Sequence, residues 1–325
     1  MPGKTPNTPT PNPLQRARRV VIKVGSALLV DAASGRLNRA WLETLVAEIC
    51  EIQETLQPEL DTACLLLFAS DHGLANDGVS AYPRAVTAQM VLNFLRGGAA
   101  ANVLSAQTGC RLRIVDVGVD ADFTPHPQLT QAKVARGTAS ILHADAMSAE
   151  ELERALAAGR EAAQEALRAG HRVVLFGEMG IGNTAISSLL LSELTGLPLA
   201  DCVGPGTGLD SAGVARKLAL LERVRQRPTE PFPKGDAAAE AITLLRRYGG
   251  FEIAALAAAI STVAASIKIK PPSPDAKASA TRLALSVNVK LSVVMSICPP
   301  TPEPPACALI RVPLPARLTL FSPVI

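Results

Sequence analysis

Strand-like and helix-like segments alternate along most of this chain, and this alternation most constrains its fold. Short, mainly apolar runs at residues 63–68, 112–117 and 171–176 predict strands. Segments with helical periodicity separate them, at residues 83–95 and from about 148 to 170. Strands that alternate with helices indicate a parallel sheet with helices on both faces. We therefore expect an α/β fold, a Rossmann-like parallel sheet flanked by helices.

The helix predictions also name particular side chains. Ser148 and Glu151 have the spacing of a capping box, so a helix is expected to begin there. The helix at 83–95 is expected to pack through one apolar side, formed by Val86, Met90, Leu92 and Leu95. A segment rich in Ala and Ser at 253–267 predicts a buried helix, because a membrane span needs ~20 apolar residues.

The clearest functional signal is the glycine-rich segment 177–184, Gly-Glu-Met-Gly-Ile-Gly-Asn-Thr, between the strand at 171–176 and a predicted helix at 187–194. Gly180 and Gly182 allow the backbone to approach a ligand closely, and a helix start offers unpaired N–H groups. Glu178 places a carboxylate at the same rim, as a general base or a ribose ligand; a partly exposed loop acid is the alternative. The segment predicts a phosphate site and a sugar-phosphate substrate whose reacting carbon carries positive charge.

Two further turns lie where ligands bind in open α/β sheets. Asp71 and His72 follow the strand at 63–68, so either could line the site; alternatively, Asp71 caps backbone N–H groups. The glycine turn at 204–208 leads to a helix that Asp210 could cap. This turn is either a plain connection between helices or a second phosphate contact.

Composition bears on the remaining function classes. The net charge is only +3 and the basic residues are scattered, with aromatic residues at 3%, so nucleic-acid binding has little support. The six cysteines lack the close spacing of a metal or redox site, which favours reduced thiols in a cytoplasmic protein. We therefore expect no metal, no cofactor, no nucleic-acid partner and no membrane span.

From about residue 42 to 260 the chain resembles the nicotinate-nucleotide–dimethylbenzimidazole phosphoribosyltransferases. The segments that carry the resemblance, in order and spacing, are 67–73, 78–83, 86–90, 115–118, 135–138, 177–184, 206–209 and 249–252. The resemblance implies transfer of the phosphoribosyl group of nicotinate mononucleotide to 5,6-dimethylbenzimidazole. Nicotinate leaves and α-ribazole 5′-phosphate forms, a step of cobalamin biosynthesis. It also implies a homodimer.

The resemblance implies a set of substrate-binding residues. They are Glu178, Gly180, Gly182, Asn183, Thr184, Gly206, Gly208, Tyr82 and Met90. The first five would hold the nucleotide, the next two would lie near its phosphate, and the last two would border the base pocket.

The C-terminal part departs from this family. The family's catalytic base is a glutamate in a Gly-Glu-Gly context, and this sequence has no glycine after Gly250. Glu303 lies in Thr-Pro-Glu-Pro-Pro and does not match, so no catalytic residue is assigned. We expect a fold incomplete at its C-terminus and an impaired transferase; a non-catalytic nucleotide-binding remnant is the alternative.

Both ends of the chain differ in character from its centre. Residues 1–13 hold five prolines and predict disorder, whereas residues 18–45 resemble the start of glutamate 5-kinase. Lys23, Gly25 and Ser26 would there serve the phosphates of ATP, which leaves an amino-acid kinase fragment as a further alternative. The expected division is 1–45 (disordered start and kinase-like fragment), 46–265 (phosphoribosyltransferase-like domain) and 266–325, a Pro-rich tail. A shifted reading frame and a genuine tail both fit its eleven prolines.

Overall fold

A computed structural model describes residues 39, 43, 46, 47, 50, 56, 57, 62–233 and 235–266. The predicted disordered start, nearly all of the kinase-like fragment and the Pro-rich tail after residue 266 lie outside the described residues. The fold below is that of the central part of the chain.

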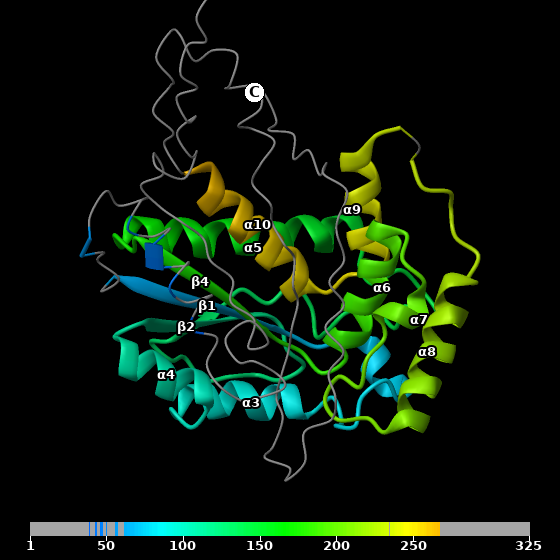
Figure 1. The fold of residues 1–325 in the computed structure, drawn as a ribbon, viewed down its shortest axis with the longest axis horizontal. Helices are drawn as coiled ribbons and strands as arrows, with labels where there is room; N and C mark the ends of the chain where they lie inside the picture. The colour runs from blue at the N-terminus through cyan, green and yellow to red at the C-terminus, as the bar shows by residue number, and fades with distance from the viewer. Residues whose placement is uncertain are drawn as a thin grey trace, which may run out of the picture.

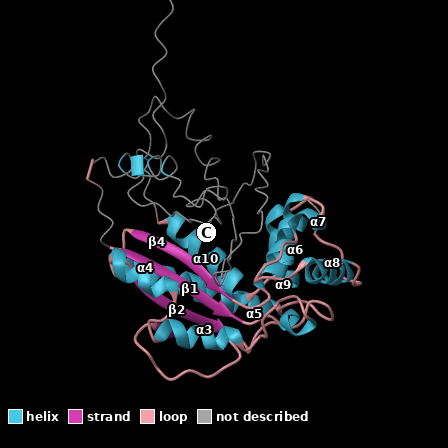
Figure 2. Cartoon of the chain, turned by 60° about the horizontal axis from the view of Figure 1, so that its bottom comes forward, coloured by secondary structure: helices cyan, strands magenta, loops and turns pink. Residues whose placement is uncertain are grey.

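Four parallel strands form one sheet in the order β3-β2-β1-β4. Their bounds are β1 Ala63–Ser70, β2 Arg111–Gly118, β3 Leu129–Gln131 and β4 Val173–Met179. β1 is central, and its Leu67 lies opposite Ile114 on one side and Gly177 on the other. Nearly every residue of β1 is buried, as expected of a parallel strand covered on both faces. The α/β prediction is confirmed, and Figure 2 shows the strands with their helices.

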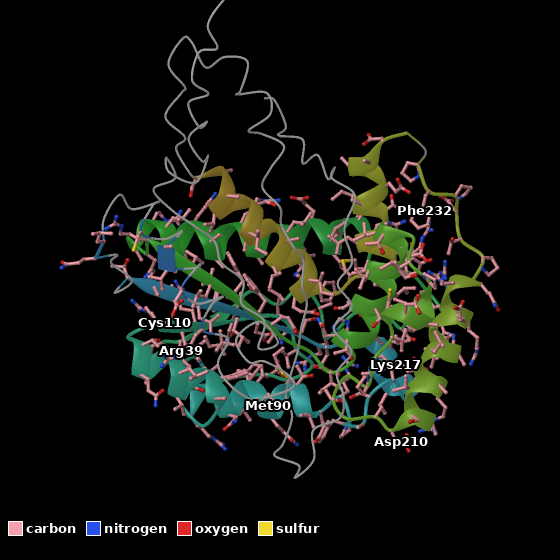
Figure 3. All side chains as sticks on the ribbon, in the orientation of Figure 1. Arg39, Met90, Cys110, Asp210, Lys217 and Phe232 are labelled. Carbon is pink, nitrogen blue, oxygen red and sulfur yellow. The ribbon has the colours of Figure 1, made fainter. Side chains whose placement is uncertain are left out.

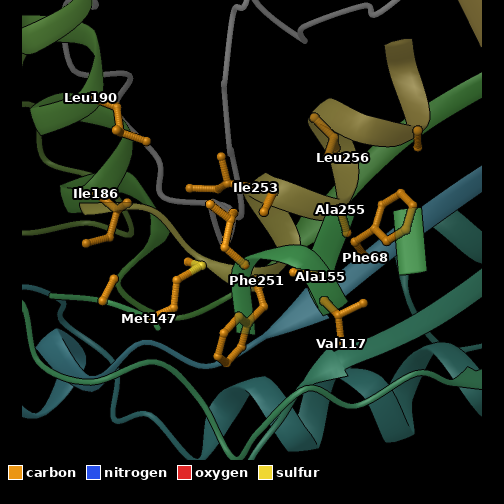
Figure 4. Packing of buried hydrophobic residues seen from close by; sticks show 14 of the residues in the cluster. Phe68, Val117, Met147, Ala155, Ile186, Leu190, Phe251, Ile253, Ala255 and Leu256 are labelled. Carbon is orange, nitrogen blue, oxygen red and sulfur yellow. The ribbon is translucent and has the colours of Figure 1, made fainter. Parts of the chain in front are cut away.

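Helices cover the two faces of the sheet in pairs (Figure 1). α5 (Ala149–Arg168) and α10 (Phe251–Ala265) lie on one face, and α3 (Val86–Leu95) and α4 (Ala100–Thr108) lie on the other. Side chains of a strand alternate between its faces, so Phe68 of β1 packs toward α5 and α10, whereas Leu67 packs with Val91 and Phe94 of α3. Figure 4 shows the first of these two cores.

The remaining elements gather beyond the ends toward which the strands point (Figure 1). They are η2 Gly73–Asp77, α6 Asn183–Thr195, α7 Leu199–Cys202, α8 Ser211–Arg225 and α9 Ala237–Tyr248. This group therefore sits at the carboxyl edge of the sheet, where open α/β folds bind their ligands.

The α5–α10 pair depends on a glycine. Gly159 of α5 is buried, and a Cβ on it would overlap the carbonyl oxygen of Ala255, with the Ala255 Cα only 2.7 Å away. The two helices can approach this closely only because no side chain stands between them. At the start of α5 the predicted capping box is confirmed, since Ser148 Oγ accepts from Glu151 N at 3.1 Å and Glu151 Oε2 accepts from Ser148 N at 2.8 Å.

Some expected elements differ from the observed ones. α6 begins at Asn183, four residues before the predicted start, so Asn183 and Thr184 belong to its first turn. The apolar side expected for α3 was wrong at Leu92, which is 40% exposed, while Thr87 is buried. The predicted buried helix is confirmed as α10, whereas α4 and α9 were not predicted. Among the helices that the structure describes, none has the length and apolarity to span a bilayer.

Candidate functional site

The glycine-rich loop after β4 forms the centre of the candidate site. β4 ends at Met179, and Gly182, with φ of 98°, is the N-cap of α6. This left-handed backbone favours glycine and turns the chain sharply from the strand into the helix. The first turn of α6, with Asn183 and Thr184, therefore begins at the carboxyl edge of the sheet, where its N–H groups can attract an anion.

The glycines of this loop pack against His72, the residue two positions beyond β1. A Cβ on Gly180 would lie 3.1 Å from His72 Nε2 and 2.6 Å from the carbonyl oxygen of Ser70, and one on Gly182 would lie 3.3 Å from His72 Cβ. Gly250, before α10, would collide with His72 Cε1 if it carried a side chain. Gly180 and Gly182 thus leave room for His72 of the same chain. The sequence predicted these glycines to make room for a ligand and did not indicate this packing.

A buried hydrogen-bond network joins this loop to α10. Glu252 Oε1 accepts from His72 Nε2 at 2.7 Å and from Asn183 Nδ2 at 2.8 Å, and all three residues are 0% exposed. The ring of His72 therefore lies beneath the glycine loop, and its contact with a ligand stays a prediction.

Lys217, on α8, provides a buried positive charge beside the same loop (Figure 3). It is 1% exposed, and its Nζ donates to Thr184 Oγ1 at 3.0 Å and to the carbonyl oxygen of Gly204 at 3.2 Å. Burial lowers the pKa of Lys217 to about 8. Gly206, with φ of 58°, packs closely here, because a Cβ on it would lie 3.3 Å from the Lys217 Nζ. The two glycine segments, predicted separately, therefore meet at this lysine.

The segment that contains Tyr82 touches the second glycine turn. Ser80 Oγ and Thr207 Oγ1 share a hydrogen bond of 2.9 Å, and Ser80 Oγ also accepts from the backbone N of Tyr82 at 3.2 Å. The Tyr82 side chain is 38% exposed. Gly208 has φ of 107°, and no atom lies within 4 Å of where its Cβ would be, so its conformation rather than close packing favours glycine.

Met90 lies on α3, away from Lys217 in Figure 3. It is partly buried against the core that contains Val91 and Phe94. Thr87, one turn earlier on α3, accepts a hydrogen bond at 3.1 Å from the backbone N of Ile181 in the glycine loop. α3 is thus attached to the loop, and Met90 follows one turn further along.

The acidic residues of the site differ in surroundings. Glu178 is a partly buried residue of β4 and lies opposite Phe68 of β1. Because side chains alternate along a strand, Glu178 lies on the same face of the sheet as Phe176, the face that α10 covers. Asp71 is buried, its Oδ2 accepts from Asp120 N at 2.8 Å, and burial raises the pKa of its carboxyl group. Asp71 therefore pairs with one backbone N–H group, that of Asp120. The predicted cap by Asp210 is present, since its Oδ1 accepts from Gly213 N at 2.7 Å.

Comparison with known proteins bears on this arrangement. A family model described as "Phosphoribosyltransferase" matches residues 35–269. The chain is 48% identical over 223 residues to the nicotinate-nucleotide–dimethylbenzimidazole phosphoribosyltransferase of Dechloromonas aromatica (strain RCB), a match that covers 69% of this chain and 63% of that protein. The enzyme of the same name from Cupriavidus taiwanensis is 44% identical over 256 residues, with 78% of this chain and 70% of that protein covered. The chain belongs to this phosphoribosyltransferase family. The chain spans about 63% of the length of the Dechloromonas aromatica relative.

A solved structure supports the phosphoribosyltransferase fold. CobT from Thermus thermophilus superimposes with a TM-score of 0.62 at 39% sequence identity, over 71% of this chain and 68% of that one. The family match confirms the resemblance of the central part of the chain. It begins at residue 35, inside the segment that resembles glutamate 5-kinase, and none of these matches supports the kinase resemblance.

Sequence reasoning found most of the loop but missed two of its partners. Lys217 occurs in the middle of a charged helix, where a lysine ordinarily faces solvent, so no pattern marks it. Glu252 belongs to the resembling segment 249–252, which was the available signal, although no role was attached to it.

Proposed function

We propose that this chain binds nicotinate mononucleotide, with its phosphate at Lys217, Thr184 and Gly206, for transfer of the phosphoribosyl group to 5,6-dimethylbenzimidazole. The products would be nicotinate and α-ribazole 5′-phosphate. The observation that carries this proposal is the buried Lys217 ammonium at the meeting point of the two glycine segments. The names of the relatives supply the substrates.

The surroundings of Lys217 favour an anion. An ammonium has three N–H donors, and two of them meet a hydroxyl and a carbonyl oxygen. Within the described residues no carboxylate forms an ion pair with Lys217, although a buried charge ordinarily has a partner. The N-terminus of α6 adds its partial positive charge beside Thr184. A phosphate dianion would complete both interactions.

The transfer step can be described in terms of bonds. The electron pair of the C1′–N bond leaves with nicotinate, and C1′ becomes oxocarbenium-like. A ring nitrogen of the benzimidazole attacks from the opposite face, which inverts the β-linkage to α. Glu178, one residue before the end of β4, would stabilise the positive charge at C1′ or bind a ribose hydroxyl.

The proton on the other benzimidazole nitrogen must be removed, and a positioned base typically accelerates such a step about 10²–10⁴-fold. The 325 residues hold no Gly-Glu-Gly segment, in which the family carries its base. We therefore propose that this chain binds the nucleotide and transfers slowly. The domain at residues 46–265, the homodimer and the cytoplasmic location stay predictions.

Calorimetry and product analysis with the 325-residue chain test this proposal. We expect titration with nicotinate mononucleotide to show saturable binding. With dimethylbenzimidazole present, we expect α-ribazole 5′-phosphate to form at least about 100-fold more slowly than with the Dechloromonas aromatica relative. Absence of binding would contradict the nucleotide site, and a rate equal to that of the relative would contradict the impairment.

The affinity for nicotinate mononucleotide is expected to fall about tenfold between pH 7 and pH 9. Burial lowers the pKa of Lys217 to about 8, so its positive charge is present below this pH and lost above it. The second ionisation of a phosphate monoester lies near pH 6, so the ligand keeps its charge throughout. Calorimetry at pH 7, 8 and 9 measures the effect. An equal slope in Lys217→Met would show that another group titrates.

A further inference from the structure

One oxygen atom connects three segments of the candidate site. Glu252 Oε1 accepts from His72, which follows β1, and from Asn183, which begins α6, while Glu252 itself lies in the first turn of α10. The two hydrogen bonds join residues 180 and 69 positions apart in the sequence. This one carboxylate therefore fixes the start of α6 relative to both α10 and the end of β1.

The packing around the network leaves the loop little freedom. Gly180 and Gly182 lie against the ring and the Cβ of His72, and Gly250 lies against Cε1 of the same ring. A shift of His72 would therefore displace the glycine loop, because close-packed groups move together. The Asn183 side chain is held a second time, since its Oδ1 accepts from Ser187 Oγ at 3.1 Å.

Stability alone does not account for this carboxylate. Within the described residues, Glu252 Oε2 and His72 Nδ1 are buried without a hydrogen-bond partner. A buried polar group with unused hydrogen-bonding capacity costs stability. The α10 N-terminus offsets part of that cost, because a carboxylate in the first turn interacts favourably with the helix dipole. The remaining cost points to a role in fixing the conformation of the site, for which buried polar groups are retained in some proteins.

We propose that Glu252 is a positioning residue for the phosphoribosyl site, which acts through Asn183 and His72 to hold the loop 180–184 in its binding conformation. This inference rests on the proposed function for the identity of the ligand. The hydrogen bonds of Glu252 Oε1 go to His72 and Asn183, so Glu252 acts through these two partners. Loss of the carboxylate lowers the fraction of molecules whose loop has the binding conformation. The apparent affinity falls in proportion to that fraction.

The test compares Glu252→Ala with Glu252→Gln in the full chain. Glutamine keeps an oxygen that can accept both hydrogen bonds, and its amide group takes the place of the unpartnered Oε2. We expect Glu252→Ala to raise hydrogen exchange of the amides in residues 177–186 about tenfold in the ligand-free protein, and to raise the Kd for nicotinate mononucleotide about tenfold. Glu252→Gln is expected to restore both values to within about threefold of the parent.

Val263→Ala is the matched control on the same helix. Val263 is a buried residue near the far end of α10, so its truncation lowers stability without touching the network. Val263→Ala should leave unchanged both the hydrogen exchange of the amides in residues 177–186 and the Kd for nicotinate mononucleotide. Equal loop exchange in Glu252→Ala and the parent, or an equal increase in Val263→Ala, would overturn the proposal.

A second pair of variants applies if Glu252→Ala does not fold. His72→Gln retains a donor near the position of Nε2, whereas His72→Leu removes it. Only His72→Leu should therefore raise the hydrogen exchange of the amides in residues 177–186. Equal exchange in both variants would overturn the proposal. If the parent binds no nicotinate mononucleotide, the proposed function fails. The exchange measurement on the ligand-free protein then still decides whether Glu252 positions the loop.

Discussion

Lys217→Met is expected to weaken binding of nicotinate mononucleotide about 100-fold, because the loss of a hydrogen bond to a charged group costs about 1.5–3 kcal/mol. Methionine keeps an unbranched apolar chain that can fill the same buried space between α8 and the glycine turn. Burial opposes the charge of Lys217, as its pKa of about 8 shows. Removal of the buried charge offsets the loss of the hydrogen bonds to Thr184 and Gly204, so the variant should fold. Calorimetry measures its affinity directly.

Nicotinate riboside, which lacks the phosphate, is the control ligand for this variant. If Lys217 binds the phosphate, the parent should prefer the nucleotide to the riboside, and Lys217→Met should lose most of that preference. A variant that binds both ligands equally less well would indicate that Lys217 only joins α8 to Thr184 and Gly204.

Gly159→Ala is expected to destabilise the fold by about 3 kcal/mol, through overpacking of the α5–α10 contact. Helix propensity alone predicts the opposite sign, since alanine is favoured over glycine by about 1 kcal/mol within a helix. The added methyl group would, however, overlap the backbone of Ala255, and a backbone atom cannot turn aside as a side chain can. We therefore expect the clash to outweigh the propensity, as measured by urea denaturation.

Ala157→Gly separates these two effects. Ala157 is an exposed residue of the same helix, so its replacement by glycine measures propensity without a packing contact. We expect a loss of about 1 kcal/mol. If Gly159→Ala proves as stable as the parent, α5 and α10 must be able to separate without cost, and the role assigned to Gly159 would be wrong.

The central architecture could be predicted because its elements have local signals. β1 is a continuous apolar run and β2 is apolar at most of its central positions. α5 starts at a capping box that depends on residues three positions apart. The glycine loop was recognisable for the same reason, since strand, glycines and helix follow one another in the sequence. α4 has no such signal, because it buries only Ser105 fully.

The partners of the loop could not be predicted from local patterns. Asn183 and Glu252 are 69 positions apart, and Lys217 reaches Thr184 from a different helix, so only the tertiary fold brings them together. The early start of α6 has the same origin, because the buried hydrogen bonds of Asn183 favour a helical turn where the sequence Gly-Asn-Thr suggests a loop.

The central place of β1 has a consequence for how the chain is made. β1 is the first of the four strands in the sequence, yet it pairs with β4, whose Phe176 lies opposite Leu66. At about 5–20 residues per second, a ribosome needs roughly 5–20 s to synthesise the stretch between them. During that interval one edge of a strongly apolar strand is open, and open edges pair readily with other chains. This edge of β1 thus stays open to such pairing until β4, and the glycine loop that follows it, have been synthesised.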